Sequence, residues 1–149
     1  MFKSIKRFFD DNLDHKEGAI LSYQALNLAA VVILYEAARA DFQMDPLEHK
    51  KLLNLIADRF SLSSDETIKL LALAEEKSDL SAGLHEFTTL INQHWSTEER
   101  ILLVDNMWEI VYADGHLDNN EHHLMRRVQN LLYVPHREYI FAKLKHKTP

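Results

Sequence analysis

The sequence predicts an all-α protein: a single-domain helical bundle of about seven to eight helices, built from two helical repeats related by a pseudo-twofold axis. Gly and Pro occur only three times each in 149 residues, which favours long helices over tight turns. Apolar residues recur at helical spacing along most of the chain. The phrase ADFQMDPLEH at residues 40–49 returns as ADGHLDNNEH at residues 113–122, which indicates a duplicated unit.

Composition bounds the domain organisation and excludes several classes of function. Apolar residues make up 46% of the chain, so residues 1–149 suit one domain with a sizeable core. The net charge of −6 disfavours a nucleic-acid partner, because phosphate contacts need clustered Lys and Arg. The absence of cysteine excludes disulfides, thiolate metal sites and thiol chemistry. No membrane span or secretory signal is visible, and we expect a cytoplasmic protein.

Residues 1–17 are predicted to form an N-terminal amphipathic helix. Its apolar side chains fall on one helical face and its basic side chains on the other. Such a helix packs on the core, or residues 1–13 make a peripheral contact with a membrane surface. The apolar face holds Phe2, Ile5, Phe8 and Phe9, and the basic face holds Lys3, Lys6 and Arg7.

The first repeat is predicted over residues 19–77. It opens with a helix over residues 19–41 whose middle is apolar nearly all round, as expected of the central buried element. A second helix follows over residues 45–60, with Pro46 at its first position. A third helix starts at Ser63, which forms the pattern of a capping box with Glu66.

A connector helix over residues 79–95 precedes the second repeat, which we place at residues 97–146. Ser96 and Glu99 predict another capping box, and Pro135 opens the last helix. The two repeats match without a gap at a period of 73 residues. The matching pairs include Tyr35 with Trp108, Leu52 with Met125, and Phe60 with Tyr133.

Each repeat carries an acidic loop with the pattern Asp-x-x-x-Asp-x-x-Glu, which supplies three carboxylates. Carboxylate and loop carbonyl oxygens are the hard ligands that Ca²⁺ or Mg²⁺ prefers, and Mn²⁺ also suits them. Zn²⁺ fits less well, although nearby histidines could bind a softer ion. The candidate metal ligands are Asp41, Asp45, Glu48, Asp114, Asp118 and Glu121. The nearby histidines are His49, His116, His122 and His123.

Part of this pattern also has a purely structural explanation. Asp45 and Asp118 are good N-caps, and the Glu three residues later completes a capping box in each copy. Asp41 and Asp114 are harder to explain, because they fall in the predicted last turn of the preceding helix, where the dipole disfavours a carboxylate. Capping alone and a bound cation are therefore both open. The spacing differs from that of an EF-hand loop.

The segment ADGHLDNNEHHLMRRV resembles the signature of the TerB-like family, bacterial all-helical proteins associated with tellurite resistance. The likeness is strongest at Ala113, Asp114, Gly115, Asp118 and Glu121. The N-terminal domain of DjlA-type membrane co-chaperones is similar. The resemblance implies acidic residues that converge on one face and a role in stress response, as a cation-binding or scaffolding component near the inner membrane. It does not imply catalysis.

These observations lead to three hypotheses for function. The first is a non-catalytic module that uses its acidic loops to bind a divalent cation or a protein partner. The second is a structural or membrane-peripheral adaptor without metal. The third, which we favour least, is a metal-dependent hydrolase, because the sequence has no nucleophile elbow, phosphate-binding glycine loop or zinc-protease motif. We expect no catalytic residues and no cofactor other than the cation, and a homodimer stays open.

Overall fold

The computed structural model describes residues 18–39, 46–80, 84–113, 117 and 119–147. The predicted N-terminal helix over residues 1–17 lies outside these ranges. The described residues form seven helices and no strands, which confirms the all-α prediction. The helices are α2 (Gly18–Ala38), α3 (Pro46–Phe60), α4 (Ser64–Leu80), α5 (His85–His94), α6 (Thr97–Val111), α7 (Asn119–Leu131) and α8 (His136–His146).

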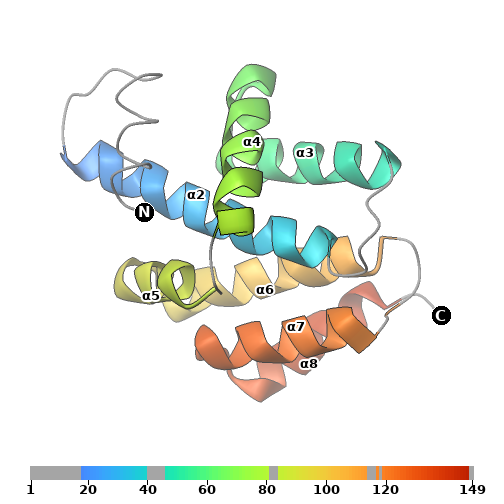
Figure 1. Ribbon diagram of the computed structural model, residues 1–149. Coiled ribbons are helices and arrows are strands. Elements are labelled where there is room, and N and C mark those ends of the chain that lie inside the picture. Colours follow the sequence, from blue (N-terminus) through green and yellow to red (C-terminus); the bar gives the residue numbers. More distant parts are fainter. Residues whose placement is uncertain (1–17, 40–45, 81–83, 114–116, 118, 148–149) are drawn as a thin grey trace.

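Helix α2 is the centre of the bundle. It runs through the middle of the molecule, with α3 and α4 on one side and α5 to α8 on the other (Figure 1). Residues 28–34 of this helix are completely buried, although successive residues point in different directions around the helix. A helix buried all round must be apolar all round, which is the pattern that the sequence shows there.

The two halves repeat the same order of helices and much of the same packing. Helix α2 packs against α3 and α4, and α6 packs against α7 and α8. The end of α2 at Ala38 and the start of α3 at Pro46 recur 73 residues later, at Val111 and Asn119. Packing between α3 and α4 has no counterpart of similar extent between the described residues of α7 and α8. The pseudo-twofold axis stays a prediction.

Helices α3 and α7 end in the same way, with a non-glycine residue in the left-handed region. Ser61 has φ 55° and Tyr133 has φ 53°. In both turns the next N–H donates to the carbonyl five residues earlier, as in a Schellman motif. The two bonds are Leu62 to Ala57 at 3.0 Å and Val134 to Gln129 at 3.1 Å.

This shared turn corrects the gapless match between the repeats. Ser61 and Tyr133 are 72 residues apart, so the second copy is one residue shorter between its loop and this turn. Phe60 is buried, whereas Tyr133 is 74% exposed, so they do not occupy equivalent places. The buried residue that precedes the turn in the second copy is Leu132.

The two capping boxes predicted at Ser63 and Ser96 are confirmed. The Ser63 hydroxyl accepts from the Glu66 N–H at 3.2 Å, and the Glu66 carboxylate accepts from the Ser63 N–H at 3.0 Å. Ser96 and Glu99 make the same pair of bonds at the start of α6. These bonds pair N–H groups that a helix start otherwise leaves without a partner in the helix.

The connection between the halves differs from the predicted connector over residues 79–95. Helix α4 continues to Leu80, and α5 begins only at His85. Residues on α5 and α6 then hold the end of α7. The Asn92 amide donates to the Leu131 carbonyl at 2.8 Å, and the Arg100 guanidinium donates to the Leu132 carbonyl at 2.9 Å.

No described helix is long and apolar enough to cross a membrane.

Candidate functional site

The six predicted cation ligands fall mostly outside the described residues. Four of them lie in the undescribed loops: Asp41, Asp45, Asp114 and Asp118. Glu48 lies in α3, but its side chain is not among those described. Glu121 is described, lies in the first turn of α7, and is only 5% exposed. The described residues contain no group of three or more His, Asp or Glu side chains that could hold a metal ion.

The ends of α2 and α6 change the reason for expecting a cation. The helices end at Ala38 and Val111, three residues before Asp41 and Asp114. The helix dipole acts within the last turn and falls off beyond it. The expected penalty on these two carboxylates therefore no longer applies, and a bound cation is not needed to offset it.

The helices that border the two acidic loops pack across the halves. Helix α3, which follows the first loop, contacts α6, which precedes the second loop. Helix α7, which follows the second loop, contacts α2, which precedes the first. Helices α2 and α6 also pack along each other, and their C-terminal ends lie at the same end of the molecule (Figure 1).

An aromatic cluster lies at the C-terminal end of α6, which precedes the second loop. The ring of Trp108 stacks on Tyr112 with centroids 5.6 Å apart and lies 5.2 Å from the ring of Tyr139. Burial raises the pKa of Tyr112, and the nearby Glu121 carboxylate raises it further. Glu121, at the start of α7, is therefore close enough to the end of α6 to act electrostatically on it.

Two polar atoms of this cluster are buried without a hydrogen-bond partner among the described residues. They are the indole Nε1 of Trp108 and the hydroxyl of Tyr139. Burial raises the pKa of Tyr139 to about 12. Such groups cost about 1–3 kcal/mol each when they stay unpaired. The sequence marked Trp108 as a core position of the repeat, but no local pattern indicated that Tyr139 would pack on it from α8.

Positively charged side chains lie near His122, one of the histidines that could bind a softer metal ion. The pKa of His122 is lowered first by burial and then by the charges of Lys143 and Arg126, with a smaller effect from His123. His122 is therefore neutral at pH 7. A neutral imidazole can bind a metal ion, but the positive charges of Lys143 and Arg126 oppose the binding of a metal cation there.

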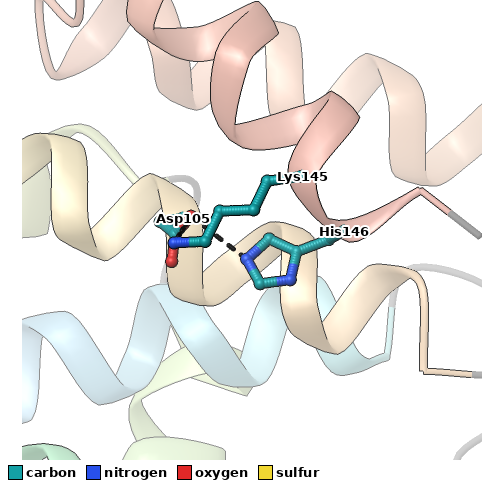
Figure 2. A network of polar contacts seen from close by, with 3 residues as sticks. All are labelled: Asp105, Lys145 and His146. Carbon is teal, nitrogen blue, oxygen red and sulfur yellow. Dashed lines mark hydrogen bonds and ion pairs between the residues drawn. The ribbon is translucent and has the colours of Figure 1, made fainter.

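A polar network ties the end of α8 to the middle of α6. The Nε2 atom of His146 lies 3.1 Å from the Asp105 carboxylate, and the Lys145 ammonium lies 3.4 Å from the same oxygen. All three side chains converge between the two helices, with Asp105 on α6 (Figure 2). Asp105 is mostly buried, so this network anchors the last helix.

The comparison with known families decides the classification. The model of the family described as tellurite resistance protein TerB matches residues 27–144. This chain belongs to the TerB family. The TerB match spans both acidic loops and the described helices from Asn27 in α2 to Leu144 in α8.

A solved structure of a protein of unknown function has a similar fold. The crystal structure of a protein of unknown function from Porphyromonas gingivalis W83 superposes with a TM-score of 0.59. The two proteins are 21% identical, and the match covers 92% of this TerB chain and 99% of the other. At that identity, the likeness shows a shared fold alone. No curated protein matches the chain.

Proposed function

We propose that this TerB-family chain is a non-catalytic module, associated with tellurite resistance, that binds a divalent cation between its two acidic loops. The observation that carries the proposal is the reciprocal packing across the halves, α3 on α6 and α7 on α2. Because the helices that border each loop contact the other half, this packing supports the inference that the two triplets of carboxylates face each other. The cation is Ca²⁺, Mg²⁺ or Mn²⁺, which prefer oxygen ligands.

Chemistry supports binding over direct detoxification. Tellurite reduction or capture most simply uses thiols, because a soft chalcogen suits a soft nucleophile. The chain has no cysteine, so a stress-related role acts through a ligand or a partner protein. The resemblance to DjlA-type co-chaperones is consistent with a partner protein near the inner membrane.

Calorimetric titration of the full chain with Ca²⁺, Mg²⁺, Mn²⁺ and Zn²⁺ tests the proposal. We expect one of the three oxygen-preferring ions to bind and to raise the melting temperature. Asp41→Asn and Asp114→Asn should each weaken binding about tenfold or more, since each removes a charged ligand. Asp65→Asn is the matched control, because Asp65 lies in the exposed first turn of α4, outside both loops.

Two outcomes would overturn this function. One is the absence of both heat and a melting shift with every ion. The other is that Asp41→Asn and Asp114→Asn bind as tightly as Asp65→Asn. The second candidate, a structural adaptor whose loops only cap α3 and α7, would then be favoured. It is already supported by the helix ends at Ala38 and Val111, which remove the dipole penalty from the loop carboxylates.

A further inference from the structure

Helix α8 is at the edge of the bundle. Among the described helices, only α6 packs extensively against it, and Figure 1 shows α8 at the outer side of the molecule. Its inner face is formed by Tyr139 and Ala142, which are buried. The opposite face is therefore available to solvent or to a partner.

The outer face of α8 carries apolar side chains that the fold does not bury. Phe141 is 69% exposed and Leu144 is 61% exposed, and their spacing puts them on neighbouring positions of one helical face. Ile140 is half-buried beside them. A shallow hollow of about 400 Å³ lies along this face, lined by Arg137, Glu138, Ile140, Phe141 and Leu144.

The segment that carries this apolar face is positively charged, unlike the whole chain. Residues 136–147 hold four Lys or Arg and one Glu, whereas the whole chain has 17 basic and 23 acidic residues. Arg137 and Lys147 are exposed near the two ends of α8. Lys145 is 58% exposed even though it lies near Asp105. We call this surface, formed by Arg137, Phe141, Leu144, Lys145 and Lys147, the basic apolar face of α8.

This charge pattern disfavours a second copy of the chain as the occupant. If two copies paired antiparallel about Phe141, Arg137 of one would lie opposite Lys145 of the other. If they paired parallel, each basic side chain of one copy would lie near the same side chain of the other copy. Like charges placed opposite each other across a helix pair are destabilising. The basic apolar face therefore suits an anionic partner.

We propose that the basic apolar face of α8 docks on a membrane surface that contains anionic lipids. Phe141 and Leu144 insert at the boundary between headgroups and acyl chains, while Arg137, Lys145 and Lys147 stay at the level of the phosphates. Exposed apolar side chains beside a shallow hollow fit a flat, deformable surface better than a peptide that needs a deep groove. The contact is peripheral and depends on lipid charge.

Co-sedimentation of the full chain with vesicles tests this proposal. Phosphatidylcholine vesicles are compared with vesicles that also contain phosphatidylglycerol, and EDTA is present so that the proposed cation site does not contribute. We expect binding to the anionic vesicles only. The double variant Phe141→Ser/Leu144→Ser should weaken that binding about tenfold or more, because it removes the inserted side chains. Both residues are exposed, so circular dichroism should show an unchanged fold.

Two control variants separate this face from other surfaces. Ile68→Ser removes an exposed apolar side chain from α4 and should leave vesicle binding unchanged. Phe8→Ser/Phe9→Ser tests residues 1–13, the other basic apolar segment of the sequence. The proposal is overturned if the chain does not bind anionic vesicles, which would favour an acidic protein. It is also overturned if binding survives Phe141→Ser/Leu144→Ser, whether or not Phe8→Ser/Phe9→Ser abolishes it.

Discussion

Replacing Tyr133 with glycine should stabilise the protein. Tyr133 has φ 53°, where the Cβ atom of an L-residue approaches a carbonyl oxygen at a cost of about 1–2 kcal/mol. Glycine avoids that contact but loses about 0.5–1 kcal/mol through its greater freedom in the unfolded chain. The side chain is 74% exposed, so little packing is lost. The net gain in unfolding free energy should be about 0.5–1 kcal/mol.

Thermal and urea unfolding of Tyr133→Gly and Tyr133→Ala measure this gain. For a domain of this size, the glycine variant should melt about 1–4 °C above the wild type. Alanine keeps the Cβ atom and should show none of that increase. Ser61 has φ 55° at the equivalent turn after α3, so Ser61→Gly and Ser61→Ala form a matched pair.

The comparison between glycine and alanine decides whether the backbone is the cause. If the Gly and Ala variants at position 133 have equal unfolding free energies, the left-handed backbone does not limit stability there. If Tyr133→Gly is less stable than the wild type, the aromatic ring makes contacts whose contribution exceeds the cost of the left-handed conformation.

Three further changes have defined outcomes. Tyr139→Phe removes a buried hydroxyl without a partner and should raise the unfolding free energy by about 1 kcal/mol. Because burial raises the pKa of Tyr139 from 10.0 to about 12, wild type should lose unfolding free energy as the pH rises from 10 towards 12, whereas Tyr139→Phe should not show this loss; identical alkaline unfolding profiles for the two proteins would contradict this. Hydrogen bonds from Ser63 lower the pKa of Glu66, so the stability difference between wild type and Glu66→Gln should be present at pH 7 and shrink as the pH falls below 4.5, a trend measurable by urea unfolding. Asp105→Ala should lower the unfolding free energy by about 1 kcal/mol, and a double-mutant cycle with His146→Ala should give a non-zero coupling, whereas additive effects would exclude the contact.

The sequence predicted the helices well because capping residues and apolar periodicity involve residues that are close together along the chain. The Ser63–Glu66 and Ser96–Glu99 boxes involve residues three apart, and the burial of residues 28–34 follows from an apolar sequence around the whole helix. The end of a helix is a weaker signal. The helix predicted over residues 19–41 reaches Asp41, but α2 ends at Ala38, which removes the reason for expecting a dipole penalty at Asp41.

Only part of the candidate site could be predicted from the sequence. The duplicated phrase indicated which carboxylates belong together, but the contact of α3 with α6 and of α7 with α2 depends on packing between distant segments. The match of Phe60 with Tyr133 was wrong, because one residue is missing from the second copy before a turn whose geometry the sequence did not mark with glycine.

The sequence by itself determined the all-α class, the capping boxes, the central apolar helix and the family, since each depends on residues close together along the chain. Only the tertiary structure decided which side chains meet across the bundle. Asn92 and Arg100 bind the end of α7 from 39 and 32 residues away, and Tyr139 packs on Trp108 from another helix. It also decided that Phe141 and Leu144 face outward, because α8 carries apolar residues on two faces and, among the described helices, packs extensively against α6 alone.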